Sequence, residues 1–423
     1  MRKTVFLVTG LVYFFFHSMP ALCGTHSNSP AGWGGRSVGM AGVGVASSTD
    51  ASGMAYNPAC LAEVERSRFD LGLGFLWPRR SFSNAWNDDV SSKRIWYPVP
   101  QVGYVHKSAD TDFSMGIGGF FTYGAGTEYQ FQTPWFPGDV KKAYSEMGVV
   151  KITPTIAYKI NSRLSAGVTL DINYGTCKVG TPFGPAYLDF SDNADGWGYG
   201  FKAGLLYHFS DSLIFGLAYT SESNLEDLKS DNAYIEWSPL SPYGKTVWRY
   251  TKAEIINMQQ PCKFAFGVAY QATKRLLFAL DTTWENYSDA LEKLEVKLAD
   301  GTGPDMTMTI PLNRSDTYSL GLGIEYMVTE KFSLRTGYHY DSDMVDYSKP
   351  FPIIPNTGPT HMIAIGCGYW WNNYEVDFGY SYQFLHGSWT RESSHQIPGI
   401  DEYDNSYTDY SGHYWALTVS KLF

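Results

Sequence analysis

The sequence predicts an all-β protein, a 14-stranded antiparallel transmembrane β-barrel with an N-terminal hatch in its lumen. Apolar and polar residues alternate with period two over stretches of ten residues or more, about the length that a tilted strand needs to cross a bilayer. Aromatic residues make up 16% of the chain and charged residues only 17%, as in barrels with aromatic girdles. A glycine-rich segment precedes the alternating stretches and fits neither a helix nor a strand.

Residues 1–23 form a predicted signal peptide. A basic start and the apolar run of residues 5–16 lead to small residues before Gly24. Cys23 leaves a lipoprotein open as the alternative, although Leu22 stands where a small residue is expected. After removal of this segment no run of about 18 apolar residues remains, which excludes helical membrane spans. We therefore expect an exported protein, located in the bacterial outer membrane.

Residues 24–66 are the predicted hatch. Within them, residues 31–64 carry seven glycines among small and apolar residues, too many for a stable free helix. Such a segment wraps tightly only inside another structure. Its Asn57-Pro58-Ala59 turn is expected to be stiff, because proline fixes one dihedral and asparagine can bond nearby backbone. Two roles remain open for this turn, a part in gating and a purely structural anchor to the wall.

Residues 67–423 are the predicted barrel. Connections along the chain alternate between short, such as residues 161–163, and long, such as residues 124–147. Outer-membrane barrels have short periplasmic turns and long outer loops, and an even strand count places both termini in the periplasm. The predicted strands are residues 68–77, 98–106, 112–123, 148–160, 164–178, 197–209, 213–236, 245–270, 274–297, 306–328, 331–341, 359–371, 373–386 and 410–423.

Charged residues occupy the faces of these strands that lie opposite the apolar faces. A basic side chain that faces lipid at mid-bilayer costs roughly 2–4 kcal/mol, so we expect the charges to face the lumen and to pair with one another. The charges considered are Lys202, Asp281, Glu325, Glu375 and Asp377.

Short motifs spread over almost the whole mature chain resemble those of one family. They are Gly35-Arg36, residues 39–42, Asp50-Ala51, Asn57-Pro58-Ala59, residues 154–158, 164–167, 196–200, 204–207, 216–221, Pro261, and residues 267–270 and 281–284. The set resembles the long-chain fatty acid transporter family, which includes toluene and xylene uptake channels. The resemblance implies a fourteen-stranded barrel closed by a hatch, with hydrophobic ligands bound in the lumen and released sideways at a kinked third strand.

The predicted third strand contains Gly116, Gly118 and Gly119. The adjacent glycines interrupt the alternation and are expected to form a bulge or bend. By the resemblance, these three residues form the lateral gate. The alternative is that the glycines only make room for a bulky neighbour or for the hatch.

The two long loops at residues 124–147 and 179–196 are rich in aromatic residues. A groove between them resembles the entry site of the family, and Lys141 or Lys142 is expected to hold a carboxylate head group. The alternative is an aromatic interface belt with solvated lysines. The predicted entry residues are Trp135, Phe136, Lys141, Lys142, Tyr144, Phe183, Leu188 and Phe190.

No catalytic pattern accompanies the nine dispersed histidines, so we predict no enzyme, and we expect no cofactor and no metal. A net charge of −10 disfavours nucleic acid as a partner. The predicted function is passive uptake of hydrophobic molecules, with long-chain fatty acids as the first choice. Alternatives are an aromatic hydrocarbon channel, a porin, and a surface adhesin or antigen that uses the tyrosine-rich residues 400–410.

The expected partners follow from the predicted location. Outer-membrane lipid would surround the wall. The terminal Phe423, at the end of an alternating strand, looks like the signal that the barrel assembly machinery recognises. We expect a monomer.

Overall fold

The computed structural model describes most of the chain. The described residues are 29–93, 96–190, 192–256, 258–312, 314–344, 360–389 and 406–423. The predicted signal peptide and residues 400–405 of the tyrosine-rich loop lie outside them. No helix among the described residues is long and apolar enough to cross a bilayer.

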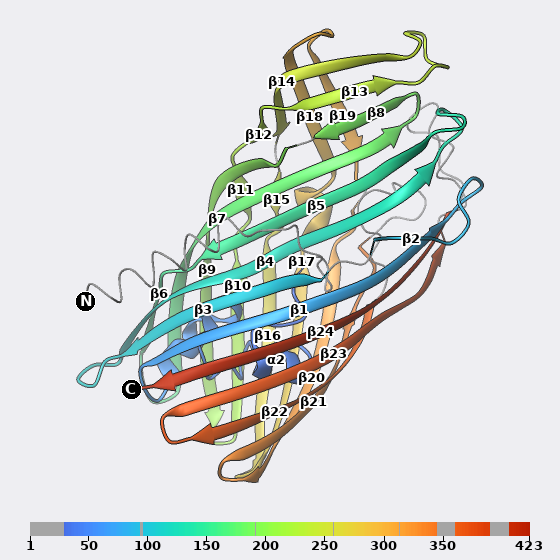
Figure 1. Cartoon of the computed structure of the whole chain (residues 1–423). Coiled ribbons are helices and arrows are strands. Elements are labelled where there is room, and N and C mark those ends of the chain that lie inside the picture. The colour runs from blue at the N-terminus through green and yellow to red at the C-terminus, as the bar shows by residue number, and fades with distance from the viewer. Residues whose placement is uncertain are drawn as a thin grey trace.

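One antiparallel sheet closes on itself to form the wall (Figure 1). Strand β1 (Arg68–Ser83) pairs with β24 (Tyr407–Leu422) on one side and with β3 (Tyr97–Lys107) on the other, so β1 is not an edge strand. Because closure pairs the backbone groups of every strand with a neighbour, this arrangement can stand in hydrocarbon. The prediction of a closed antiparallel all-β barrel is confirmed.

The remaining strands follow in chain order, and four short helices accompany them. The strands are β2 (Val90–Ser91), β4 (Phe113–Gln132), β5 (Val140–Ile152), β6 (Thr155–Lys159), β7 (Leu164–Phe183), β8 (Ala186–Phe190), β9 (Ala194–Ser210), β10 (Leu213–Thr220), β11 (Ser223–Leu225), β12 (Leu228–Ser230), β13 (Ala233–Trp237), β14 (Thr246–Ile256), β15 (Gln259–Gln260), β16 (Lys263–Thr273), β17 (Leu276–Glu285), β18 (Lys293–Gly301), β19 (Met306–Pro311), β20 (Thr317–Thr329), β21 (Phe332–Asp341), β22 (Thr360–Trp371) and β23 (Tyr374–Trp389). The helices are α2 (Gly35–Gly39), α3 (Gly53–Tyr56), η1 (Pro58–Glu63) and α4 (Tyr287–Ala290).

The number of strands differs from the prediction, because the sheet contains 24 strands rather than fourteen. Several predicted strands are interrupted. The predicted strand at residues 213–236 is divided into β10 to β13, and the one at residues 274–297 is divided by α4. Prolines account for two of the interruptions, since Pro154 lies between β5 and β6 and Pro261 between β15 and β16, and proline has no N–H for a ladder.

The strands also reach further than the alternation predicted. The predicted loop at residues 124–147 is reduced to a turn at residues 133–139, because β4 and β5 pair from Gly119 to Gln132. The predicted loop at residues 179–196 is largely the β7–β8 hairpin and the start of β9. Strands β8, β13, β14, β18 and β19 thus rise at the end of the barrel that lies opposite the end of β24 (Figure 1). Burial in these extensions no longer alternates strictly, as in β8, where all five residues are buried.

Apolar side chains cover the outward face of the middle of the wall. On β1, Leu71, Leu73 and Phe75 are exposed while the residues between them are buried. On β20, Leu320, Leu322 and Ile324 are likewise exposed. A wide belt of exposed apolar residues is unfavourable in water and favourable in hydrocarbon. The predicted period-two alternation is therefore present where it was clearest in the sequence.

Residues 29–64, which we call the inner segment, lie against the inner face of the wall, with α2 in the bore (Figure 1). Helix α2 contacts β21 to β24, and η1 contacts β4, β6, β7 and β9. Wall glycines permit this close approach. A methyl group added at Gly379 would lie 2.4 Å from Gly35 O, and one at Gly216 would lie 2.4 Å from Val45 O. These wall glycines therefore admit the backbone of the inner segment rather than shape the strands.

We predict that Gly167→Ala lowers the free energy of unfolding by about 1–3 kcal/mol, because overpacked sites force backbone shifts. The added methyl group at Gly167 would lie 2.6 Å from the backbone nitrogen of Ala59. Reversible urea unfolding of the protein in lipid vesicles measures the change. Gly119→Ala is the control, since its methyl group would meet only Val102, at 3.4 Å. Equal losses for the two variants would contradict the prediction.

Candidate functional site

The Asn57-Pro58-Ala59 corner is bonded both within the inner segment and to the wall. Asn57 Nδ2 donates to Val45 O at 2.8 Å and to Leu205 O on β9 at 3.0 Å. Its Oδ1 accepts from Ala59 N at 3.1 Å, which is the local backbone bond that the sequence predicted. A methyl group at Gly204 would lie 1.9 Å from Asn57 Oδ1. These are the contacts of a structural anchor, and a part in gating stays a prediction.

The end of the inner segment is held by a second set of polar contacts. Glu63 accepts from Ser165 Oγ at 2.6 Å and lies 3.4 Å from Lys159 Nζ and 3.5 Å from His208 Nε2. Lys107 Nζ donates to Ala62 O at 2.7 Å. Burial acts to raise the pKa of Glu63, but the Ser165 hydrogen bond, Lys159 and His208 outweigh it, so the pKa lies below the usual value. The carboxylate is therefore a charged tie between η1 and the wall.

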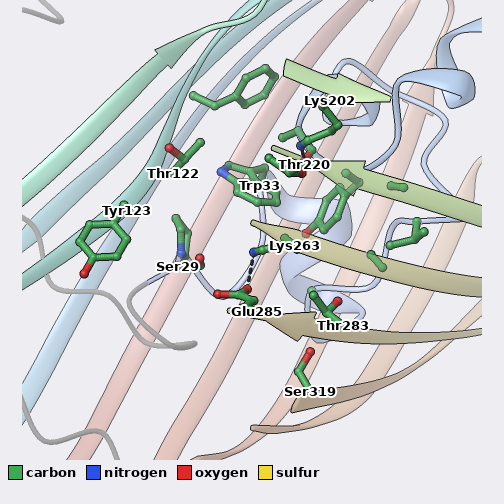
Figure 2. A pocket seen from close by; sticks show the side chains of 18 of the residues that line it. Ser29, Trp33, Thr122, Tyr123, Lys202, Thr220, Lys263, Thr283, Glu285 and Ser319 are labelled. Atoms are coloured by element: carbon green, nitrogen blue, oxygen red, sulfur yellow. Dashed lines mark hydrogen bonds and ion pairs between the residues drawn. The ribbon is translucent and has the colours of Figure 1, made fainter. Parts of the chain in front are cut away.

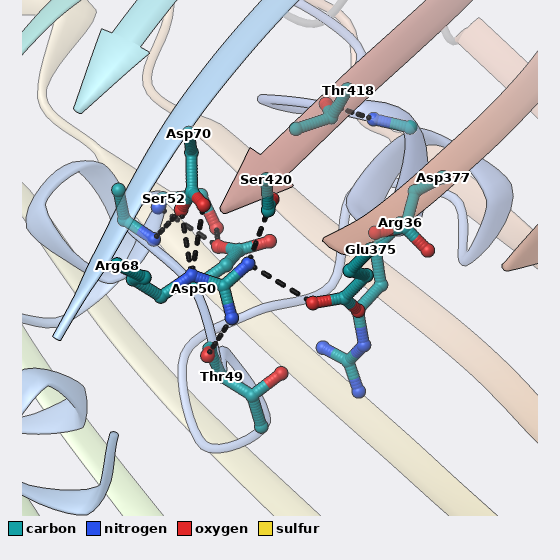
Figure 3. A network of polar contacts seen from close by, with 12 residues as sticks. Arg36, Thr49, Asp50, Ser52, Arg68, Asp70, Glu375, Asp377, Thr418 and Ser420 are labelled. Carbon is teal, nitrogen blue, oxygen red and sulfur yellow. Dashed lines mark hydrogen bonds and ion pairs between the residues drawn. The ribbon is translucent and has the colours of Figure 1, made fainter. Parts of the chain in front are cut away.

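Arginines carry the ion pairs between the other end of the inner segment and the wall (Figure 3). Arg36 of α2 donates to Glu325 at 3.2 Å through two nitrogens and to Ser47 O at 2.8 Å. Arg335, whose side chain is fully buried, lies 2.5 Å from both Glu325 and Asp377. One carboxylate thus bridges two guanidinium groups, one from the inner segment and one from β21.

Arg68 forms a second centre beside the first (Figure 3). It lies 2.9 Å from Asp70 and 3.1 Å from Glu375, and it donates to Thr49 O of the inner segment at 3.0 Å. Asp70 in turn accepts from Ala51 N at 2.7 Å. Arg68 therefore ties three strands of the wall and the inner segment to one buried group of charges, since it also bonds Ser420 at 2.9 Å.

The predicted lumen charges face inward, but the prediction that they pair with one another is wrong. Glu325, Glu375 and Asp377 pair with arginines. Asp281 accepts from Gly44 N at 2.6 Å and Val45 N at 2.9 Å, and Lys202 donates to the carbonyl oxygen of Ala55. The partners are mostly groups of the inner segment, and nothing in the spacing of the strand residues reveals where that segment lies.

A cavity of about 140 Å³ lies between the inner segment and the wall (Figure 2). Aromatic side chains line part of it, among them Trp33, Tyr56, Phe120, Tyr123 and Tyr287. The polar part holds the pairs Lys151–Asp171, at 3.0 Å, and Lys263–Glu285, together with Lys202. The cavity therefore offers a ligand both an apolar and a charged surface.

Next to the cavity, the inner faces of the extended strands pack against one another. We call this cluster the outer apolar core. Leu188, Leu228 and Val296 are fully buried in it, and the cavity residues Tyr123 and Tyr287 belong to it. The cluster also includes Met147, Val149, Cys177, Val179, Phe190, Leu225, Ile235, Tyr250, Ile255, Met258, Leu291, Leu294, Leu298, Leu312 and Met344.

The three glycines of the predicted gate lie on β4, which is continuous through all of them in its pairing with β3. The register irregularity of β4 lies at Thr122, between Phe121 and Tyr123, and not at the predicted Gly118-Gly119 position. The pairing with β3 accounts for the difference, because it holds the backbone extended on both sides of the glycines.

Gly116 and Gly118 point toward the inner segment. A methyl group at Gly116 would lie 2.9 Å from Met54 Sδ, and one at Gly118 would lie 3.0 Å from Met54 Cε. A methyl group at Gly118 would also lie 2.4 Å from the ring of Phe120. These distances fit the alternative that the glycines make room for the hatch and a bulky neighbour. The role of Gly116, Gly118 and Gly119 as a lateral gate stays a prediction.

Both lysines of the predicted entry site already have carboxylate partners. Lys141 Nζ lies 2.8 Å from both Asp139 and Glu236 and stands over the ring of Phe136. Lys142 Nζ lies 3.2 Å from Glu128 and stands over the ring of Tyr144. A ligand carboxylate would have to compete with these residues, of which Glu236 lay unrecognised in a predicted strand.

The apolar residues of the predicted entry site come together at the base of the hairpins. Leu188 and Phe190 are fully buried in the outer apolar core, and Phe183 packs against it. Tyr144 donates to Phe190 O at 3.2 Å, and Trp135 O accepts from Ser238 next to β13. The structure thus joins the two predicted loops and adds β13, but it buries the residues that were expected to line an open groove.

Sequence reasoning missed Trp33, Arg36 as an ion-pair partner, Arg68 and Arg335. Trp33 Nε1 donates to Phe121 O on β4 at 2.8 Å and packs edge-on against Tyr56. A tryptophan inside a glycine-rich segment was an available signal, since tryptophan rarely stands alone among small residues. The arginines carried no local signal, because their partners are far away in the sequence.

The comparisons place the chain among outer-membrane proteins. A family model described as outer membrane protein transport protein (OMPP1/FadL/TodX) matches residues 25–423. A long-chain fatty acid transport protein of Escherichia coli O6:H1 is 25% identical over 379 residues, 80% of this chain and 81% of that protein. Outer membrane protein P1 of Haemophilus influenzae is 22% identical over 398 residues, 82% of this chain and 83% of that protein.

Solved structures share the fold. The crystal structure of the P. putida toluene transporter TodX superposes with a TM-score of 0.79 at 20% identity, over 93% of this chain and 99% of that chain. The Ralstonia pickettii toluene transporter TbuX gives a TM-score of 0.74 at 20% identity, over 93% and 99%. At this identity the likeness concerns the fold alone.

We predict that Arg36→Met lowers the free energy of unfolding by about 2–3 kcal/mol, because it removes charged hydrogen bonds from a buried carboxylate. Arg36→Met combined with Glu325→Gln should cost less than the sum of the single changes, by about 1 kcal/mol or more, because the two groups interact. Urea unfolding of the four proteins of this cycle measures the coupling. Strict additivity would show that the pair is energetically independent.

We further predict that the Glu63 tie weakens in acid. A carboxylate whose pKa is lowered in the folded protein adds stability at higher pH, and this stability is lost as the pH falls through the lowered pKa, below about 4. The thermal unfolding midpoint should therefore fall less steeply with acidification in Glu63→Gln than in the unmodified protein. Parallel pH profiles for the two proteins would refute this.

Proposed function

The chain belongs to the outer membrane protein transport family of OMPP1, FadL and TodX, and on this basis we propose that it carries hydrophobic small molecules inward across the outer membrane. Membership in a transport family agrees with the prediction that the protein is not an enzyme. Uptake of apolar molecules suits a wall that stands in hydrocarbon, because the bilayer is the phase that these molecules prefer.

One observation carries the proposal, namely the apolar interior of the extended part of the barrel. A water-filled pore needs polar residues inside, as porins have. Here the inner faces of β8, β13 and β18 instead contribute Leu188, Ile235 and Val296 to the outer apolar core. The inner segment fills the bore beside this core, with Met40 and Leu61 fully buried. This arrangement favours an apolar cargo over the porin alternative.

We propose that the 24 strands make fourteen membrane crossings. Strands β10 to β13 follow one another between the same neighbours, since β10 pairs with β9 and β16 while β13 pairs with β8 and β14. The same holds for β14 to β16, for β17 with β18, and for β19 with β20. Merging such series supports the predicted count, with outer-membrane lipid against the apolar belt.

The substrate is proposed as a class, long-chain fatty acids or aromatic hydrocarbons. One relative is named a long-chain fatty acid transport protein and one structural neighbour a toluene transporter. Both kinds of molecule fit an aromatic cavity. Lateral release along β4 is part of this proposal, with Gly116, Gly118 and Gly119 beside Met54 of the inner segment or exposed on the strand.

The test is uptake in a host that lacks its own hydrophobic transporter. We expect the protein to restore uptake of labelled oleate or of labelled toluene, and purified protein in planar bilayers to show no large steady ion current, because the inner segment fills the bore. A vector that encodes Gly119→Ala is the matched control, since this position contacts only Val102. Absence of uptake for both compounds would overturn the proposal, and a large steady current would favour a porin.

A further inference from the structure

Three lysines line the cavity, and one of them differs from the other two (Figure 2). Lys151 lies 3.0 Å from Asp171, and Lys263 forms an ion pair with Glu285. Lys202 has no carboxylate within ion-pair distance among the residues that the structure describes, and its Nζ donates to the carbonyl oxygen of Ala55. It is thus a buried cation with a neutral partner.

The other acidic groups around the cavity are already engaged. Asp281 accepts two backbone N–H groups of the inner segment, Gly44 N at 2.6 Å and Val45 N at 2.9 Å. Asp341 lies 3.2 Å from His339 Nε2. With Asp171 and Glu285 held by their lysines, no carboxylate of the lining turns to Lys202, which is only 7% exposed.

Burial of a charged group is costly unless an opposite charge or several hydrogen bonds compensate it. The strand neighbours of Lys202 offer only hydroxyl groups, since Thr169 of β7 and Thr220 of β10 are its register partners. A carboxylate is a stronger acceptor for an ammonium group than a peptide carbonyl. An anionic group that enters the cavity therefore competes with Ala55 for the lysine.

We propose that Lys202 is a switch between two acceptors, the carbonyl of Ala55 and the anionic head group of a ligand in the cavity, and that transfer to the ligand loosens α3 from the wall. The proposal rests on the proposed function, because it assumes that the cavity receives the transported molecule. It makes Lys202 a residue that distinguishes anionic amphiphiles from neutral hydrocarbons.

The position of Ala55 in α3 gives the switch an effect on β4. The preceding residue, Met54, occupies the space beside Gly116 and Gly118, and it contacts Thr153 Oγ1 at 3.9 Å. Release of the Ala55 carbonyl frees the helix of four residues that holds Met54 in this place. A bound anion is thereby linked, through Lys202, Ala55 and Met54, to the strand that contains the predicted lateral gate.

A cysteine of the inner segment can report the loosening. Cys60 is 1% exposed, and a methyl group at Gly53, the first residue of α3, would lie 3.0 Å from its Cβ. In a full chain with Cys177, Cys262 and Cys367 replaced by alanine, maleimide reacts with Cys60 only when α3 or η1 moves. The ligands are oleate and oleyl alcohol, which share a chain and differ in the charge of the head group.

We expect oleate to accelerate alkylation of Cys60 by about tenfold or more, the factor that corresponds to loss of one charged hydrogen bond. Oleyl alcohol should bind without this acceleration. Lys202→Met should abolish the acceleration and weaken oleate binding by about tenfold, while binding of oleyl alcohol stays unchanged. Lys202→Arg should keep the response, because it keeps the cation.

The control is Lys263→Met combined with Glu285→Gln, which removes a paired cavity lysine together with its partner and should keep the oleate response. Equal effects of oleate and oleyl alcohol on the chain that retains Lys202 would overturn the inference while the proposed function stands, and this comparison does not depend on the folding of any Lys202 variant. An unchanged oleate response in Lys202→Met would overturn it as well. If neither ligand binds, the proposed function fails and the inference fails with it.

Discussion

Buried ion pairs between the inner segment and the wall are the interaction on which the rest of the structure depends. A closed barrel satisfies its own backbone but leaves a bore, and in this protein the bore holds the inner segment. Arg36, Arg68 and Arg335 each meet carboxylates with little access to water. Such pairs are costly to break one partner at a time, so they fix one position of the segment more strongly than apolar contacts of small residues would. Wall glycines then permit the backbone to approach at this position and at few others.

The ties of the inner segment are distributed unevenly, and this unevenness has functional meaning. The arginine centres hold its α2 end to β20 to β24 and β1, and Glu63 with Lys107 holds its last turn to β3, β6 and β7. Helix α3, between these ends, is joined to the wall by the Asn57 corner and by one hydrogen bond from Lys202. The least strongly held part thus borders the cavity and β4. A segment fixed at both ends can move in its middle without leaving the bore.

The lumen combines a charged region around the inner segment with an apolar region in the extended strands. The charged region exists because the inner face of the wall must compensate the polar backbone of the inner segment. The apolar region exists because β8, β13, β14, β18 and β19 rise beyond the belt and have only one another to pack against. The cavity lies where the two regions meet, with Tyr123 and Tyr287 on one side and the lysines on the other. A molecule with a long apolar part and one polar end suits this junction.

The sequence by itself determined the closed antiparallel barrel, because strand alternation is a local property that repeats along the chain, as in Leu71, Leu73 and Phe75. It also indicated that residues 31–64 are enclosed and that Asn57 bonds nearby backbone. Only the tertiary structure decided that Asp281 meets Gly44 and Val45, that Lys141 meets Glu236, and that Leu188 is buried instead of lining a groove. These pairings join residues far apart in the chain, and they depend on where the inner segment lies in the bore and on how far the strands extend. Neither quantity has a periodic signature, so the pattern of the residues alone does not reveal it.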